Sequence, residues 1–281
     1  MVGDSAHARA RVPGTGAEVL IDADGTGLVR TADGRFLRLR SVPPGLPDIL
    51  RGTRDGGDDV AAYARRLREE LLSREEAHAR ARWPAARRRV VLLGRGTAVE
   101  DLAEALREWG VTPVRHADAA ALLAACHVES VPWDVVIGYA DSPAERAGWD
   151  RLDDLPGRGT TWVRAYREGE VCFVDPVASR GEDPGSEQVR RRRLAASPVP
   201  REFEAWQNAA AESGPLPWTA RSLLVSRVLA VLLAWAHGPD TVRSYRTTLW
   251  KFVPATATIS EHPILAYPPP AVAVQPEAVR S

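Results

Sequence analysis

The stretch RVVLLGRGTAVEDLAEALREWGVTPV, residues 89–114, decides the fold of the larger part of this chain. Its apolar run over 90–93 meets a tight turn at Gly94 and Gly96, and an amphipathic helix pattern follows. A second short apolar run then begins. This order of strand, glycine turn and helix is typical of the start of a nucleotide-binding α/β domain, which raises the question of whether this one binds a nucleotide.

The segments that follow continue the same alternation. A helix is predicted over 119–126, a buried strand over 134–139 and a hairpin over 160–177. The order strand, helix, strand, helix, strand favours a parallel α/β sheet. Further helices are expected at 201–212 and 219–236, and the latter is apolar nearly all round, so we expect it to be buried, in the core or against a partner subunit.

A smaller unit precedes this domain. Turn chemistry separates three strand candidates, and a proline-started helical turn and a long helix opened by Asp58 or Asp59 follow them. The strands cover 17–21, 27–32 and 35–40, and the helices cover 43–52 and roughly 58–80. We therefore divide the chain into a flexible arm (1–16), a small strand-and-helix unit (17–82), an α/β domain (88–267) and a proline-rich tail (268–281), with a linker over 82–89.

Bulk composition excludes several classes of protein. The formal net charge is zero, so no global field draws the chain to nucleic acid or membrane, and we expect neither as a partner. The two cysteines, Cys126 and Cys172, lie far apart and form no metal-type pair or disulfide framework. The most apolar segment contains Arg227 and is short for a membrane span. The beginning of the chain has no apolar signal core, and we expect a cytoplasmic protein.

The glycine turn departs from a working dinucleotide site. Such a site needs a third glycine for close helix packing, and Val99 occupies that position. It also needs an acidic residue about 20 residues further on for the ribose hydroxyls, where Arg115 and His116 stand instead. Arg115 would suit a 2′-phosphate, which keeps NADP open as an alternative. The sequence favours a turn at Gly94 and Gly96 that is retained as architecture, with no bound cofactor.

The order of these features resembles one family. The chain is similar to the ThiF-like cyclodehydratase partner proteins of azole- and azoline-containing ribosomal peptide biosynthesis. The resemblance rests on RVVLLGRGTAVEDLAEALREWGV, WDVVIGYAD, GEVCFVDPVASRGEDPGSEQVRRRR and ISEHPILAYPPP, in that order. It implies an N-terminal winged-helix peptide-recognition element of the PqqD type, followed by a ThiF-like Rossmann-type α/β domain.

The resemblance also implies a function. Such a protein is a non-catalytic scaffold that binds the leader of a precursor peptide and presents the core peptide to a YcaO-type cyclodehydratase, as in thiopeptide-like maturation. The ATP chemistry then belongs to that partner enzyme, and no residue of this chain is assigned a catalytic role. Neither the precursor peptide nor the choice of thiazole or oxazole product follows from the sequence, and whether the chain forms a homodimer stays open.

The family's structural zinc is expected to be lost. Four cysteines hold that zinc in related proteins, and in this chain the matching places read Gly185, Gln188, Leu265 and Tyr267. A four-coordinate zinc needs four ligands, and glycine and leucine side chains supply none.

The resemblance places the leader between the last strand of the small unit and its long helix. Alternation puts Leu37 and Leu39 on one face of the strand and the remaining side chains on the other. An extended peptide added to the strand edge would pair through its backbone, while its acidic and apolar side chains meet the groove. The residues expected to line it are Phe36, Arg38 and Arg40 on the strand and Tyr63, Arg66 and Glu70 on the helix.

Other interpretations remain at this stage. The arginines of this strand fit a plain solvated face equally well on sequence alone. An enzyme using the Gly94–Gly96 turn, either adenylating or NADP-dependent, is a second hypothesis. A winged-helix DNA-binding regulator is a third, and it predicts salt-dependent DNA binding, against which the neutral net charge argues.

Overall fold

The structure is a computed structural model, and it describes residues 8–53, 57–128, 133–207 and 214–266. The chain divides into two compact units, Met1–Arg82 (unit 1) and Trp83–Ser281 (unit 2), each with its own core. The division falls after Arg82.

Unit 1 contains a four-stranded antiparallel meander in the order β1-β2-β3-β4. The strands are β1 (Ala8–Arg11), β2 (Glu18–Ile21), β3 (Gly27–Arg30) and β4 (Phe36–Leu39). The flexible arm predicted over 1–16 is therefore wrong from residue 8 onward, because Ala8–Arg11 pair with β2 and Ala10 is buried in the core. Residues 1–7 of that predicted arm lie outside the described residues.

Two helices complete the described part of unit 1. Helix α1 (Leu46–Arg51) ends at Gly52 in the left-handed conformation, as the sequence predicts, and it packs beside β1. Helix α2 (Asp58–Arg82) buries the stripe that contains Val60, Ala64, Leu67 and Leu71 against one face of the sheet. The described residues show a four-stranded sheet with two helices, and the winged-helix assignment stays a prediction.

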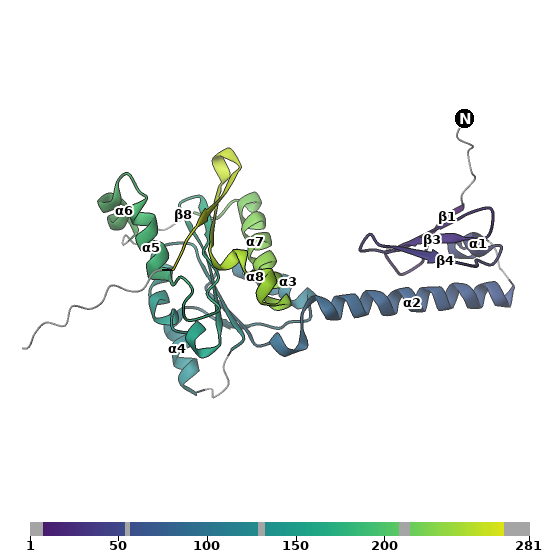
Figure 1. Cartoon of the computed structure of the whole chain (residues 1–281), viewed down its shortest axis with the longest axis horizontal. Coiled ribbons are helices and arrows are strands. Elements are labelled where there is room, and N and C mark those ends of the chain that lie inside the picture. The colour runs from purple at the N-terminus through teal and green to yellow at the C-terminus, as the bar shows by residue number, and fades with distance from the viewer. Residues whose placement is uncertain (1–7, 54–56, 129–132, 208–213, 267–281) are drawn as a thin grey trace, which may run out of the picture. The chain divides into compact units, whose positions relative to one another are not determined.

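Unit 2 is built on a mixed sheet (Figure 1). The sheet has seven strands in the order β11-β10-β9-β8-β7-β5-β6. Strands β6, β5, β7 and β8 are parallel, which confirms the α/β pattern of the sequence, and β9, β10 and β11 extend the sheet antiparallel. The strands are β5 (Val90–Leu93), β6 (Val114–His116), β7 (Val135–Ala140), β8 (Thr161–Glu168), β9 (Val171–Val174), β10 (Thr248–Val253) and β11 (Thr258–Pro263).

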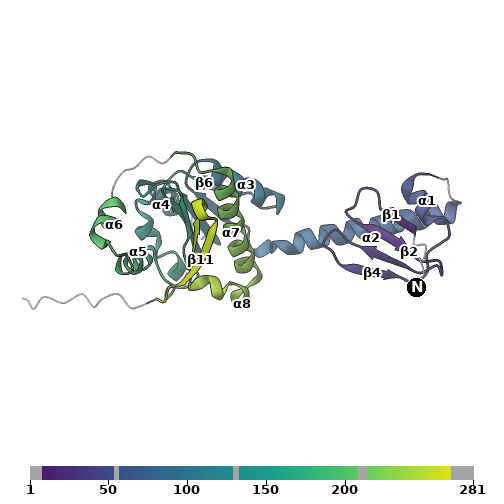
Figure 2. The ribbon, with the colours of Figure 1, turned by 90° about the horizontal axis from the view of Figure 1, so that it is seen from above.

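Helices cover both faces of this sheet and create two apolar cores (Figure 2). Helices α3 (Thr97–Glu108) and α7 (Trp218–His237) pack on one face, and α4 (Ala119–Val128) and α5 (Ser186–Ala195) pack on the other. The remaining helical segments are α6 (Pro200–Gln207), α8 (Pro239–Val242) and the 3-10 turns Ala85–Arg87, Ala144–Arg146, Trp149–Leu152, Pro156–Arg158, Ser244–Arg246 and Pro254–Thr256.

The linker predicted over 82–89 is wrong, because unit 2 begins at Trp83. The Trp83 side chain is fully buried, with its ring 5.9 Å from the rings of both Trp109 and Trp235. Its indole N–H donates to the Arg87 carbonyl oxygen at 2.7 Å, so the buried ring leaves no polar atom unpaired. The Trp83 side chain thus anchors the arginine-rich stretch 82–89 to the core of unit 2.

Helix α7 has the length and apolarity of a membrane-spanning helix. Eight of its residues are nevertheless buried in the core of unit 2, where it packs against α3, β8 and β9. Its Arg227 forms an ion pair with Glu261 of β11, with Nη2 and Oε1 2.8 Å apart. One side of the helix is therefore buried in unit 2, whereas Trp218 and Leu223 are exposed, so the predicted burial holds for part of its surface.

Candidate functional site

The glycine turn after β5 is closed against the neighbouring strand. A side chain at Gly94 would collide with the Tyr139 carbonyl oxygen of β7, since a Cβ there would lie 2.2 Å from it. Gly94 has a φ of +126° and Gly96 one of +88°, so both need the conformational freedom of glycine. Val99 is fully buried next to this turn. Close backbone packing thus accounts for Gly94, and the positive φ accounts for Gly96.

An acidic side chain faces the turn from the carboxyl end of β7. Asp141 Oδ2 lies 3.2 Å from the place a Gly96 Cβ would occupy. Asp141 Oδ1 accepts hydrogen bonds from the Tyr139 hydroxyl and from Arg167 Nε, each at 2.6 Å. This is the point where the strand order of the parallel strands reverses, and ligands of such sheets bind there. A phosphate at the turn would meet the Asp141 carboxylate.

The first acidic side chain after the second parallel strand caps a helix. Asp118 follows β6 by two residues, and its Oδ1 accepts the backbone N–H of Ala121 at 2.9 Å, which caps α4. His116, at the end of β6, is half-buried. Arg115 is exposed. Asp118 therefore serves as a helix cap, and the side chains at the ribose position are those of Arg115 and His116.

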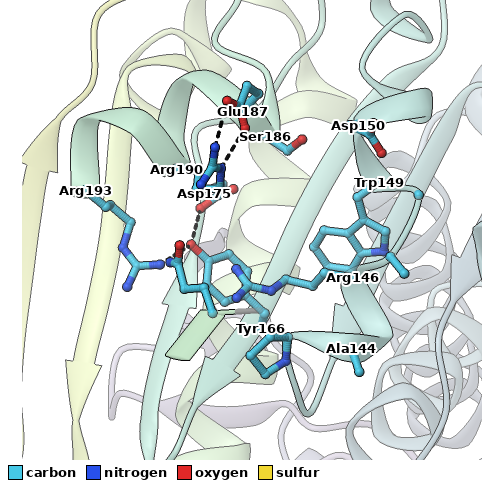
Figure 3. A pocket seen from close by; sticks show the side chains of 14 residues that line it. Ala144, Arg146, Trp149, Asp150, Tyr166, Asp175, Ser186, Glu187, Arg190 and Arg193 are labelled. Atoms are coloured by element: carbon cyan, nitrogen blue, oxygen red, sulfur yellow. Dashed lines mark hydrogen bonds and ion pairs between the residues drawn. The ribbon is translucent and has the colours of Figure 1, made fainter. Parts of the chain in front are cut away.

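A cavity of about 420 Å³ opens between the segment after β7 and the start of α5. Figure 3 shows Arg190, Glu187 and Ser186 of α5 on one side of it, Trp149 and Asp150 on another, and Arg146 beside Tyr166. The Arg146 guanidinium lies 4.3 Å from the centre of the Tyr166 ring. It lines the cavity together with Arg190 and Arg193.

The arginines of this cavity are already paired with carboxylates. Glu168 accepts from Arg146 at 3.0 Å and from Arg193 at 2.7 Å, and Glu187 accepts from Arg190 at 2.7 Å. Burial tends to raise the pKa of Glu168, but the hydrogen bond from Arg193 and the charges of Arg193 and Arg146 hold it below its usual value. The network joins the segment after β7 to β8 and α5, and it leaves little uncompensated positive charge for an anionic ligand.

The hydroxyl groups at this cavity are hydrogen-bonded to carboxylates. Ser186 Oγ donates to Asp153 Oδ2 at 2.7 Å, and burial raises the pKa of that carboxyl. Burial raises the pKa of the Tyr166 hydroxyl, which donates to Asp175 Oδ1 at 2.9 Å, so this phenol stays protonated. Elsewhere in unit 2, burial raises the pKa of the Cys172 thiol to about 12, which makes it a poor nucleophile, as its strand position suggests. Within the described ranges, no cluster of three or more histidine, cysteine, aspartate or glutamate side chains could hold a metal.

A groove lies in unit 1 between the β3–β4 hairpin and the second half of α2. Its volume is about 620 Å³. Leu37 and Leu71 contribute apolar surface, and Arg74, Glu75 and His78 contribute polar groups from the helix. This is the place between the last strand and the long helix where the sequence expects a peptide. The groove lies further along the helix than Tyr63, Arg66 and Glu70, the helix residues that the sequence predicts to bind the peptide.

The edge of the sheet beside this groove is open in the described structure, because strand β4 is the last strand of the meander. At the opposite edge, Arg51 Nη2 donates to the Arg9 carbonyl oxygen of β1 at 2.8 Å. Thr31 N–H donates to the Arg35 carbonyl oxygen, which sets the alternation of the β3–β4 ladder. Residues of an antiparallel edge strand alternately direct their N–H and C=O groups toward the neighbouring strand and away from it. Leu37 therefore bonds to β3 through its backbone, and the backbone N–H and C=O groups of Phe36 and Arg38 point away from the sheet.

The predicted strand residues lie where alternation puts them. Leu37 and Leu39 pack against the core, and Phe36, Arg38 and Arg40 are exposed on the other face, with 63% of Phe36 accessible. The predicted helix residues are spread out: Tyr63 packs against the core, Arg66 is exposed, and Glu70 pairs with Arg74 at 2.6 Å. The strand and helix sets do not share one face, and their role in binding stays a prediction. Sequence reasoning missed Leu71 and His78 as groove residues.

Comparison with known proteins gave matches only among solved structures. No family model matches the chain, and no curated protein matches it. A chain of the E. coli microcin synthetase McbBCD complex with pro-MccB17 bound is 12% identical, with a TM-score of 0.50, over 92% of this chain and 97% of that one. This chain has the fold of a microcin synthetase subunit.

Two other structures are similar at lower scores. The heterocyclase TruD is 14% identical with a TM-score of 0.47, over 93% of this chain and 42% of TruD. E. coli MccB with MccA is 9% identical with a TM-score of 0.48, over 93% of this chain and 98% of MccB. The chain thus spans about two fifths of the heterocyclase. At these identities the likeness to the microcin synthetase subunit concerns the α/β fold and not particular site residues.

Proposed function

We propose that this protein is a non-catalytic, leader-peptide-binding partner in the maturation of a ribosomally made peptide, and that it presents the peptide to a YcaO-type cyclodehydratase. The observation that carries the proposal is the open edge of β4 beside the groove of unit 1. An exposed strand edge next to a groove is the geometry of peptide capture by strand addition. The fold shared with a subunit of a synthetase complex that holds a pro-peptide supports it.

The register of the β4 edge defines what the peptide must offer. An added strand would pair with the outward backbone groups of Phe36 and Arg38. Peptide side chains opposite Leu37 would point to the same face as Leu37, into the groove with Leu71, and they should be apolar. Peptide side chains opposite Phe36 and Arg38 would lie on the other face, where acidic groups would meet Arg38 and Arg40.

The second unit supports a role without nucleotide chemistry. The Gly94–Gly96 turn is packed against β7, Asp141 faces it, and Asp118, the first carboxylate after β6, caps α4. Unit 2 would then serve as the surface that contacts the cyclodehydratase, with ATP consumed on the partner enzyme. The chain carries no structural zinc in this proposal, because Gly185 and Leu265 offer no ligand atoms.

The proposal is tested by fluorescence anisotropy with a labelled leader peptide from a short precursor encoded beside this gene. We expect saturable binding near the micromolar range, about −8 kcal/mol. Phe36→Ala and Arg38→Ala should each weaken it several-fold. Arg65→Ala, at an exposed position of α2 outside the groove, is the matched control.

A proline substitution tests the strand-addition mode. Arg38→Pro removes an outward N–H without removing a bond to β3, so it should abolish binding while the fold survives. Binding that is unchanged in Arg38→Pro, or no binding to the wild-type protein at a hundred micromolar, would contradict the proposal.

A further inference from the structure

Unit 2 contains a second groove that the proposed function does not use. It has a volume of about 500 Å³ and lies between helices α5 and α6 and strands β9, β10 and β11. Three buried side chains, Phe173, Leu249 and Ile264, give it apolar surface, together with the half-buried Phe203. The polar side chains that line it are Arg192, Arg193, Lys251 and His262.

The groove carries uncompensated positive charge. No aspartate or glutamate is among its lining residues. Arg193 is bound to Glu168, but neither Arg192 nor Lys251 has a carboxylate partner within the described part of the chain. Lys251 is also the sole lysine of the sequence. Two cations beside apolar surface favour a ligand that has both carboxylates and apolar groups.

The groove borders an open strand edge. Strand β11 is the last strand of the sheet as described, and most of its residues are exposed. Ile264 N–H donates to the Thr247 carbonyl oxygen at 2.7 Å, which sets the alternation along β10 and β11. By that alternation, the backbone N–H and C=O groups of Ile259 and Glu261 point away from β10. The edge therefore offers hydrogen bonds at the spacing of an added strand.

The edge and the groove share one face. His262 lies opposite Leu249 and Ser260 lies opposite Lys251, so the side chains of Ser260 and His262 project to the groove face. Ser260 Oγ and His262 Nε2 are 3.0 Å apart. A strand added to β11 would place every second side chain on this same face, beside Lys251 and Arg192.

We propose that this face of unit 2 binds an extended acidic segment of a partner protein as a strand added to β11. The backbone of the bound segment pairs with Ile259 and Glu261, which fixes its register. Its carboxylates pair with Lys251 and Arg192. Its apolar side chains contact the buried apolar surface around Phe173. A single-stranded nucleic acid fits less well, because it needs exposed aromatic rings for base stacking, and Phe173 is 5% exposed. The inference concerns unit 2 and stands apart from leader binding at β4.

The test uses the full chain and a fluorescein-labelled peptide of alternating glutamate and valine, flanked by prolines to limit self-association. We expect Lys251→Glu and Arg192→Glu each to weaken its binding at least tenfold. The control Arg158→Glu makes the same charge change at an exposed position outside the groove and should stay within twofold. A peptide with glutamine in place of glutamate should bind at least tenfold more weakly.

Two further arms separate the alternatives. Ile259→Pro removes an outward N–H and should abolish binding, whereas Ile259→Ala keeps the N–H and most of the affinity. Arg38→Glu weakens any capture of the same acidic peptide at β4 in unit 1. The Lys251→Glu and Arg192→Glu changes are therefore measured in the Arg38→Glu background, where the remaining binding reports on unit 2, so leader capture and this site fail independently. Three outcomes would overturn the proposal. The acidic peptide does not bind, or Arg158→Glu weakens its binding as much as the groove variants do. The third is that a labelled twelve-nucleotide RNA binds instead and depends on Lys251.

Discussion

Asp141 and Arg167 are joined at the carboxyl ends of β7 and β8, with Asp141 Oδ1 and Arg167 Nε 2.6 Å apart. Arg167 is nearly buried, and its other nitrogens bind the carbonyl oxygens of Gly169 and Gly214. The pair lies where a nucleotide would sit in a working α/β enzyme. The Asp141 carboxylate is thus held by protein groups on one oxygen and faces the Gly96 turn with the other.

The first prediction follows from this arrangement. Neither ATP with magnesium nor NADPH should stabilise the protein, because a ligand raises the melting temperature only when it binds the folded state at the concentration used. In thermal scans at millimolar nucleotide, we expect a shift below about 1 °C. A clear rise that disappears in Asp141→Ala would instead support the nucleotide-using enzyme.

A second prediction concerns Trp83. Trp83→Ala removes a fully buried ring that contacts Trp109 and Trp235, and it should destabilise unit 2 by about 3–5 kcal/mol. Urea unfolding followed by tryptophan fluorescence measures the loss. Trp218→Ala is the matched control, because that ring is 69% exposed, and its effect should stay within about 0.5 kcal/mol. Equal effects of the two changes would mean that Trp83 belongs to a solvated linker after all.

The limits of sequence reasoning are visible at particular residues. Strands β5 and β7 and helix α7 were predictable because their apolar runs are continuous, and Leu37 and Leu39 were placed by simple alternation. Strand β1 was missed because its sequence, ARAR, has no large apolar side chain. The segment is a strand because its backbone pairs with β2. Trp83 was missed because a single ring among arginines has no periodicity.

The groove of unit 1 shows a different limit. Its place between strand and helix was predicted, but which turn of the helix lines it was not. Helix α2 has 25 residues, and the point at which the β3–β4 hairpin meets it depends on tertiary packing. Tyr63 packs against the core, and the groove is lined by Leu71 and His78, about two and four turns further along the helix. No pattern within the helix reveals this difference.

A third prediction concerns acid stability. The pKa of Glu168 is lower in the folded protein than its ordinary value of 4.5, because Arg193 and Arg146 outweigh the effect of burial. Its contribution to stability is therefore full above the unfolded value and is lost as the pH falls through the folded value. Glu168→Gln should lower the melting temperature at pH 7 and flatten its decline below pH 5. Glu104→Gln, at an exposed position, should keep the wild-type decline.

The last prediction concerns thiol reactivity. Cys172 lies in β9 with its side chain fully buried, and burial raises the pKa of its thiol to about 12, so almost no thiolate exists at neutral pH. In a Cys126→Ser background, where Cys172 is the sole thiol, an aromatic disulfide reagent should give no colour with the folded protein and one equivalent after denaturation. Reaction within minutes at pH 7 in the folded state would show that β9 opens or that the thiol is activated. Cys172→Ala should leave leader binding unchanged, because Cys172 packs in the core of unit 2 and the proposed leader groove lies in unit 1.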